Sequence, residues 1–258
     1  MSFLFDFGGP KEPKIPPSIE PVAGKLPTIM GAEIAALTLG TRVAGDFYDS
    51  IRVAPQRILF GLLDVAGRSE NNQAILAAAQ KIFRSGGMEL FSAEDVNESD
   101  AISALSLRLN RGIMEAAGGV HSCPAFLGCY HEQFGTLCYT NAGHTPGLLR
   151  DRTGISELAS TGLPLGLFSH ATADAPTAGM EKGAALLLVS RGVVEGQSKD
   201  RNAEDSEFGF ERVKEFLQSE ALSHAQEIAE SILKTAQEFS SEPSVPEDMT
   251  ALCLLRTK

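Results

Sequence analysis

The sequence predicts an α+β domain in which antiparallel sheets are faced by helices. Strand-length apolar runs follow one another in hairpin-like series, and helical patterns come in pairs between those series. Strict alternation of strands and helices would instead favour a doubly wound parallel sheet. With 258 residues, of which 43% are hydrophobic, the chain is long enough for one large domain with a full core.

The first residues of the chain do not resemble packed structure. Six prolines lie within residues 8–28 among Gly and Lys, and this composition favours an extended segment. We therefore expect a proline-rich linker over residues 1–30 and a single domain over residues 31–258.

Three strands and two helices open the predicted domain. The strand candidates are the short apolar runs EIAALTLG (33–40), DFYDSIRV (46–53) and RILFGLLDV (57–65). After Ser69, apolar residues recur at spacings of three and four, which predicts a helix. A second helix follows Ser99, the candidate N-cap, and repeats the same spacing. The apolar positions of the two helices are Ile75, Ala78, Ala79, Ile82 and Phe83, then Ile102, Leu105, Leu109 and Ile113.

The second half returns to strands. CPAFLGCYH (123–131) and GTLCYTNAG (135–143) flank a Glu-Gln-Phe-Gly connection, which predicts a hairpin. PGLLR (146–150) ends at a turn, and AALLLVS (184–190) is a candidate for a fully buried strand. Ser223 and Gln226 have the spacing of a capping box that opens a helix, and MTALCLLR (249–256) is the last strand.

Composition narrows the range of partners. With a net charge of −11, the chain has no sequence-wide basic footprint for a nucleic acid or an anionic membrane. No apolar run approaches the roughly 20 residues that span a bilayer, and the N-terminus lacks the pattern of an export signal. The four cysteines form no CxxC pair, so we interpret them as small buried hydrophobes rather than zinc or redox groups. We expect a cytoplasmic protein that binds neither nucleic acid nor membrane.

Acidic residues or glycine turns mark four strand ends. Asp46 opens the second strand, Asp64 closes the third, Ser190-Arg191-Gly192 follows the buried strand, and Glu247-Asp248 precedes the last. A single acid at a strand end is usually a turn residue or solvated. Carboxylates that a sheet brings together, however, hold Mg²⁺ or Mn²⁺, and two such ions can activate water against a phosphoryl group.

Two of these acids are stronger candidates for a cation site than the others. Asp64 follows the apolar run 59–63, where an unpaired carboxylate would be costly. Strand alternation places Asp46 and Asp49 on opposite faces, so only one of them can point into a given site. Asp46, next to Gly45, is the better candidate, and Asp49 is interpreted as a strand or turn acid.

Several motifs in order resemble one known family. VAGDFYD, LLDVAG, NAGHTPGLL, TGLPLGL, SRGVVEG, EFGFERV and EDMTALCLLR are similar to the motif set of the SpoIIE/RsbU-type branch of the metal-dependent, protein phosphatase 2C-like (PPM) phosphatases. The similarity runs from about Gly31 to Arg256. It implies an α-β-β-α sandwich of two antiparallel sheets flanked by helices, with a Mn²⁺ or Mg²⁺ site of one or two ions at one edge.

The resemblance also implies roles for particular residues. Asp64 resembles the carboxylate that bridges both metals, with the Val65 carbonyl as a further ligand. Asp46 resembles the acid of the first motif, which serves one metal directly or through water. Glu247 or Asp248 stands where the family has an acid that holds the second metal, and one sequence leaves both open.

The implied reaction removes phosphate from phosphoserine or phosphothreonine on a regulatory partner protein, often an anti-sigma-factor antagonist. A metal-bridging water would attack phosphorus, so no Ser or Cys nucleophile is expected. His144, in the Asn141-Ala-Gly-His144 motif, is interpreted as a structural turn residue in preference to a metal ligand. No phosphate-binding loop of the nucleotide-binding type follows a strand.

The sequence departs from the family at two motifs. Where the family has Ser/Thr-Asp-Gly with a ligating Asp, this chain has Ser190-Arg191-Gly192, and a guanidinium cannot bind a cation. After Asp64 the chain reads Gly67-Arg68-Ser69 in place of a small-residue turn such as Gly-His-Gly.

Arg191 leaves several outcomes open. It could point into the site, replace one metal electrostatically and hold a substrate phosphate. It could turn outward while the acids still hold an ion, or it could be a surface residue in a shifted register. Two function classes follow: a serine/threonine protein phosphatase, attenuated by Arg191, and an inactive pseudophosphatase that binds a phosphoprotein.

Overall fold

The computed structural model describes residues 26–40, 45–67, 70–170, 172–198, 206–221, 223–240 and 248–258, apart from the side chains of residues 70 and 71. Most of the proposed linker, residues 1–25, therefore lies outside the described residues. The remainder of it contacts the domain, because Ile29 is buried and Arg52 donates a 2.7 Å hydrogen bond to the Thr28 carbonyl.

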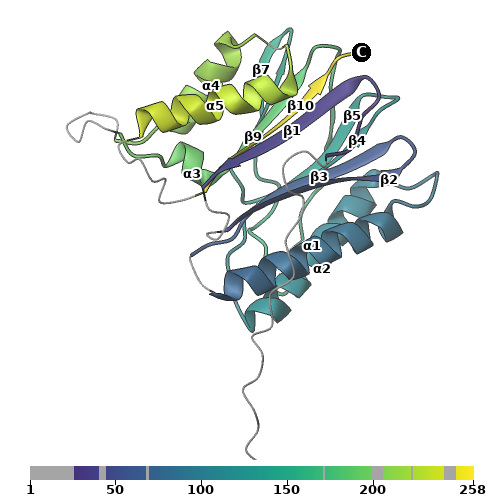
Figure 1. Ribbon diagram of the computed structural model, residues 1–258. Helices are drawn as coiled ribbons and strands as arrows, with labels where there is room; N and C mark the ends of the chain where they lie inside the picture. Colours follow the sequence, from purple (N-terminus) through teal and green to yellow (C-terminus); the bar gives the residue numbers. More distant parts are fainter. Residues whose placement is uncertain are drawn as a thin grey trace, which may run out of the picture.

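The strands form two antiparallel five-stranded sheets, as the sequence predicts (Figure 1). The first sheet has the order β1-β10-β9-β6-β7 and the second has the order β2-β3-β4-β5-β8. In the first sheet the strands are β1 (Ala32–Leu39), β6 (Gly147–Asp151), β7 (Gly154–Leu158), β9 (Ala185–Val189) and β10 (Met249–Arg256). In the second they are β2 (Asp46–Ala54), β3 (Arg57–Asp64), β4 (Ala125–His131), β5 (Thr136–Ala142) and β8 (Thr177–Gly179).

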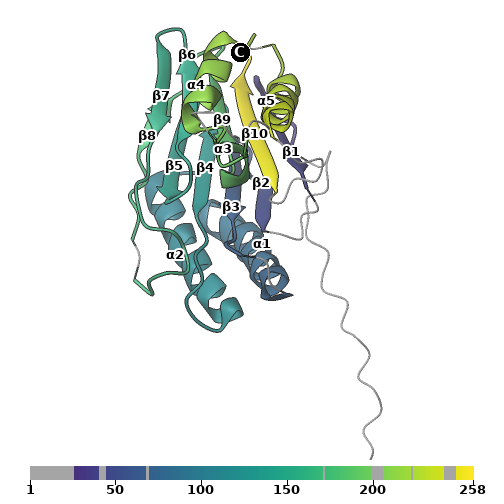
Figure 2. The ribbon, with the colours of Figure 1, turned by 90° about the vertical axis from the view of Figure 1, so that its left-hand side faces the viewer.

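Helices cover the outer face of each sheet, which completes the α-β-β-α sandwich (Figures 1 and 2). Helices α1 (Glu70–Leu90) and α2 (Glu98–Ala117) lie on the second sheet, and α4 (Phe210–Ser219) and α5 (Ala225–Phe239) lie on the first. The short α3 (Arg191–Val194) directly follows β9. No helix among the described residues is long and apolar enough to cross a membrane.

Strand alternation sorts the core into three layers. In β2, Tyr48 packs between the two sheets, whereas Phe47 packs between its own sheet and the helices α1 and α2. A third apolar layer lies between the first sheet and α4 and α5 and includes Leu187 and Ile232. All four cysteines are buried and free, as interpreted from the sequence.

The predicted helix starts need two corrections. Helix α2 is capped by Asn97, whose side chain accepts from the backbone of Ser99 and Asp100, so Ser99 is not the N-cap. Helix α5 has His224 at its N-cap, and the predicted capping box is wrong. Ser223 instead donates to the Glu227 carboxylate at 2.7 Å. Side chains that compete for a cap within two residues cannot be ranked from spacing alone.

Four elements went unpredicted: β7, β8, α3 and α4. Strand β7 is mostly exposed and carries no apolar alternation, while β8 and α3 have only three and four residues. Elements as short or exposed as β7, β8 and α3 form because longer neighbours position them, so local pattern gives little signal. Helix α4 differs, because its ten residues bury Val213 and Leu217 at helical spacing.

Candidate active site

The candidate site is the polar end of the layer between the two sheets. Along several strands, the residues that face the other sheet change from apolar to polar at this end. The buried polar residues at this end of the layer are Asp46, Asp64, Ser190, Asp248 and Thr250. They come from the ends of β2, β3, β9 and β10, which the sandwich brings to one edge.

Asp46 and Asp64 are direct partners across the β2–β3 ladder. Their relative exposures are only 6% and 7%. Like charges placed opposite each other on neighbouring strands destabilise a sheet. An arrangement of this kind persists when a positive charge balances it, which is the property expected of a cation site.

The environment of Asp46 disfavours its ionised form when no cation is bound. Burial raises the pKa of Asp46 to about 8, and the nearby charges of Asp64 and Asp248 add to this effect. The hydroxyls of Ser190 and Thr250 oppose it by hydrogen bonding. Within the described residues, the buried Oδ2 atom of Asp46 has no hydrogen-bond partner. An oxygen left in this way is suited to a hard divalent cation.

Asp248 reaches the same edge from the residue before β10. It is buried at 5% exposure and lies against Gly40, where an added Cβ atom would clash with the Asp248 Oδ1 atom. Gly40 has a φ of +131°, so both its conformation and its missing side chain let Asp248 pack there. Glu247, the other acid considered at this motif, lies outside the described residues.

Gly45, the residue before β2, holds the Val65 backbone next to Asp46. The Val65 N–H donates to the Gly45 carbonyl at 3.0 Å, and a Cβ on Gly45 would clash with the Val65 oxygen. The glycine is therefore required for this close approach. Arg68 and Ser69, which form the second departure from the family pattern, lie outside the described residues.

Arg191 lies in the site and contacts Asp64. Its Nε atom is 3.4 Å from the Asp64 Oδ2 atom and 3.8 Å from the Glu195 Oε2 atom. The preceding residue is fixed, because the Ser190 N–H donates to the Thr250 carbonyl and the Thr250 N–H donates to Ser190 Oγ, both at 2.9 Å. The Arg191 side chain is still 44% exposed, so an anion in solvent can reach it.

His144 forms the hydrogen bonds within a turn that the sequence predicts. Its N–H donates to Asn141 Oδ1 at 2.8 Å, and its Nδ1 atom lies 3.0 Å from Thr145 Oγ1. Burial lowers the pKa of His144 to about 4, so the ring is neutral near pH 7. The Thr145 hydroxyl in turn donates to the Val189 carbonyl, which ties this turn to the strand that leads into Arg191.

Sequence reasoning missed the residues that tune these acids. The sequence pattern marks Ser190 only as part of a motif and assigns no role to Thr250, although the hydroxyls of both residues hydrogen-bond to Asp46 and lower its pKa. The available signal was strand alternation. Thr250 lies two residues after Asp248, so the last strand directs both side chains to the same face.

The donor set can be tested against the metal that the resemblance implies. Among the residues that the structure describes, no three His, Cys, Asp or Glu side chains are grouped closely enough to hold a metal ion. The orphaned Asp46 oxygen, with Asp64 opposite, nevertheless supplies the oxygen donors that Mg²⁺ or Mn²⁺ prefers, and water can complete such a shell. The residues present therefore fit a hard cation at Asp46, while Arg191 competes for Asp64.

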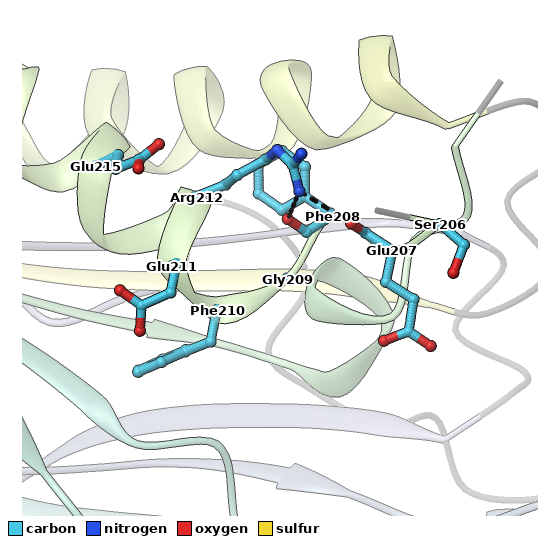
Figure 3. Close-up of a pocket in the computed structure, with 8 residues that line it drawn as sticks. All are labelled: Ser206, Glu207, Phe208, Gly209, Phe210, Glu211, Arg212 and Glu215. Atoms are coloured by element: carbon cyan, nitrogen blue, oxygen red, sulfur yellow. Dashed lines mark hydrogen bonds between the residues drawn. The ribbon is translucent and has the colours of Figure 1, made fainter. Parts of the chain in front are cut away.

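A separate hollow lies at the start of α4 (Figure 3). It has a volume of about 500 Å³ and is lined by Ser206, Glu207, Phe208, Gly209, Phe210, Glu211, Arg212 and Glu215. Arg212 turns back to donate to the carbonyls of Glu207 and Phe208, at 3.1 and 2.8 Å. None of the acids at the polar end lines this hollow, so it is not part of the candidate site.

Solved structures with the same fold define the class. The SiaA-PP2C domain of Pseudomonas aeruginosa superposes with a TM-score of 0.72 at 18% identity, over 87% of this chain and 86% of that one. The RsbU and RsbW domains of Rv1364c from Mycobacterium tuberculosis give 0.69 at 21% identity, over 90% of this chain and 63% of that one. RsbX in complex with magnesium gives 0.61 at 14% identity, over 87% and 94%. The chain thus has the fold of the PP2C-type phosphatase domains.

The family follows from the sequence match. The model of the family "Stage II sporulation protein E (SpoIIE)" matches residues 54–257, most of the chain, so the protein belongs to the SpoIIE family. No curated protein matches it in sequence. The chain spans only 63% of the Rv1364c chain.

Proposed function

We propose that the protein is a metal-dependent serine/threonine phosphatase that acts on a phosphorylated regulatory protein, with a rate attenuated by Arg191. The observation that carries this proposal is the buried pair of Asp46 and Asp64, which face each other across β2 and β3. Among the described residues, no lysine or arginine forms an ion pair with Asp46. Membership of the SpoIIE family supports the reaction class.

In this proposal Asp46, Asp64, the Val65 carbonyl and Asp248 or Glu247 hold one or two Mg²⁺ or Mn²⁺ ions. The magnesium complex of the structural neighbour RsbX supports this choice of ion. A bound ion of this type lowers the pKa of water and neutralises charge on a phosphoryl group. The chain's own residues orient the site: Ser190 and Thr250 hydrogen-bond to the Asp46 carboxylate, and Gly45 accepts from the Val65 N–H and leaves room for the Val65 carbonyl.

Arg191 is proposed to contact the substrate phosphate. Its guanidinium is partly exposed and lies at the edge of the acid pair, where it can donate charge-assisted hydrogen bonds to phosphate oxygens. To do so it must share its charge with Asp64, which weakens the hold of that carboxylate on a cation. This competition is the reason for the proposed attenuation.

The proposed substrate is a phosphorylated regulatory protein, such as an anti-sigma-factor antagonist. The presence of RsbU and RsbW domains in one neighbouring chain supports a role in such partner pathways. The four free cysteines agree with a cytoplasmic location.

One observation favours a second function. The contact between Arg191 and Asp64 puts a positive charge where the family has a ligating Asp, which suits an inactive pseudophosphatase that binds a phosphoprotein. In that case Arg191 would bind the phosphate and no turnover would follow.

Hydrolysis of p-nitrophenyl phosphate, with and without millimolar Mn²⁺, tests the proposal. The wild type should show slow, Mn²⁺-dependent turnover that Asp64→Asn abolishes. No turnover by folded wild type would contradict the phosphatase, and recovery of activity in Arg191→Asp would then support the pseudophosphatase.

A further inference from the structure

Two loops next to the candidate site carry exposed apolar side chains. Val120, Leu163 and Phe168 have relative exposures of 69%, 53% and 56%. They make up half of the large hydrophobic side chains that are exposed among the described residues; the others are Met30, Met88 and Phe134. Single exposed apolar residues need no explanation, but a group on two paired loops indicates an interaction surface.

Hydrogen bonds connect these loops to the candidate site. The Asp64 N–H donates to the Pro124 carbonyl at 2.9 Å, and the Ala66 N–H donates to the Ser122 carbonyl at 3.1 Å. Cys123 and Leu165 then exchange hydrogen bonds of 2.9 and 3.1 Å. The loop that bears Leu163 and Phe168 is thus connected to the end of β3 by hydrogen bonds through residues 122–124.

The backbone of the second loop is held in place by α2. The buried Asn110 side chain donates to the Phe168 carbonyl at 2.9 Å and accepts from the Gly166 N–H at 2.7 Å. Gly166 has a φ of +80°, and a Cβ there would clash with the His121 oxygen. The backbone is fixed while the Phe168 side chain stays in solvent, which lowers the entropy cost of binding.

The same loop also borders the turn that leads to Arg191. Pro164 packs against Gly143, where a Cβ would clash with the proline ring. The neighbouring Thr145 is hydrogen-bonded to the Val189 carbonyl. The loop therefore contacts both the segment that is hydrogen-bonded to the end of β3 and the turn that is hydrogen-bonded to the end of β9.

Charge explains why apolar contacts are needed at this place. The chain has a net charge of −11, and a phosphorylated partner is itself anionic at the reacting residue. Long-range electrostatic steering then gives no help to association. Affinity must come from short-range contacts, of which burial of apolar surface is the main source.

We propose that Val120, Leu163 and Phe168 form a docking rim for the phosphorylated partner protein. The rim contacts apolar side chains on either side of the phosphoserine while the phosphate reaches Arg191 at the edge of the acid pair. This inference rests on the proposed function and names the feature of the substrate that the protein recognises.

Phosphoserine peptides of 15 residues test the rim, since an extended peptide of this length spans up to about 50 Å. One peptide carries Leu and Phe on both sides of the phosphoserine, and its partner carries Ser at those positions. Phosphate release is measured relative to turnover of p-nitrophenyl phosphate, and binding is measured by fluorescence anisotropy. The wild type should prefer the apolar peptide by about tenfold, the effect of about 1.4 kcal/mol.

The double variant Leu163→Ser/Phe168→Ser should lose this preference in both measurements. Phe134→Ser and Met88→Ser are the matched controls, because they remove exposed apolar side chains elsewhere and should keep the preference. Equal binding of the two peptides by wild type, or an unchanged preference in the double variant, would overturn the rim. Absence of all turnover with the binding preference intact would count against the phosphatase and leave the rim supported.

Discussion

The two aspartates of strand β2 lie three residues apart, on opposite faces, and meet their surroundings in different ways. Asp49 faces α1, where Arg84 contacts it with Nε 2.6 Å from its Oδ2 atom. Asp46 faces the other sheet, opposite Asp64, and its Oδ2 atom has no hydrogen-bond partner among the described residues. Burial raises the pKa of both acids, but only at Asp49 does a guanidinium oppose it directly.

The difference separates a structural charge from a functional one. Arg84 balances Asp49 from within the chain, so this pair fastens α1 to the sheet. At the other face the described part of the chain brings two carboxylates together and supplies Arg191, which contacts Asp64. The buried Asp46 carboxyl group, with one oxygen that has no hydrogen-bond partner among the described residues, is the part of the molecule best explained by an external cation.

The largest expected effect concerns activity. Asp46→Asn should lower the Mn²⁺-dependent kcat/KM for p-nitrophenyl phosphate by about a thousandfold, since about 4 kcal/mol of charge stabilisation is lost. Asp49→Asn should lower it less than about tenfold. Equal losses in the two variants would remove the distinction between the two acids.

Stability should respond with opposite sign at the two faces. Arg84→Met leaves Asp49 buried without its partner and should lower the free energy of unfolding by about 3 kcal/mol. Asp46→Asn should raise it by about 1 to 2 kcal/mol in EDTA, because it removes a costly buried carboxylate. Urea unfolding measures both.

The exposed pair of Arg108 and Glu89 provides the control for Arg84, because Arg108→Met should lower the free energy of unfolding much less than Arg84→Met does. A loss of stability in Asp46→Asn as large as that in Arg84→Met would show that Asp46 is structural.

His144 differs from both Asp46 and Asp49, because its buried ring is neutral near pH 7. Its pKa of about 4 lies below the unfolded value near 6.5, so the unfolded state binds more protons as pH falls. Stability should therefore decrease by about 2 kcal/mol between pH 7 and pH 5 through this residue. Urea unfolding at both pH values should show that the change in stability from pH 7 to pH 5 is about 2 kcal/mol more favourable in His144→Gln than in wild type. The variant His170→Gln, at an exposed position, should change as the wild type does.

The smallest expected effect is the change in Mn²⁺ affinity when Arg191 is replaced. Replacing Arg191 by Asp exchanges a positive for a negative charge beside Asp64 and should tighten Mn²⁺ binding by at least about tenfold. Arg191→Gln should give an intermediate affinity. Unchanged affinity in Arg191→Asp would mean that the contact with Asp64 does not compete with a cation.

The sequence predicts the acid pair better than its surroundings. Asp46 and Asp64 lie at the outer ends of two strand patterns that are joined by a short turn, so hairpin pairing brings them together by local rules alone. Asn97 and Ser99 illustrate the limit of such rules, because both are good N-caps and tertiary packing selects one.

Contacts between distant segments could not be predicted. Arg84 meets Asp49 because α1 packs across β2, 35 residues further along the chain. Arg191 reaches Asp64 because β9 lies in the opposite sheet, so its direction depends on how the two sheets are packed. No local sequence pattern determines either of these two contacts.

Direct binding of Mn²⁺ to the metal-free protein tests the central claim, and calorimetry or the electron paramagnetic resonance signal of free Mn²⁺ can measure it. The account predicts that wild type and Asp49→Asn bind at least one Mn²⁺ and that Asp46→Asn does not. Absence of binding to folded wild type at millimolar Mn²⁺, or equal binding by Asp46→Asn, would contradict it.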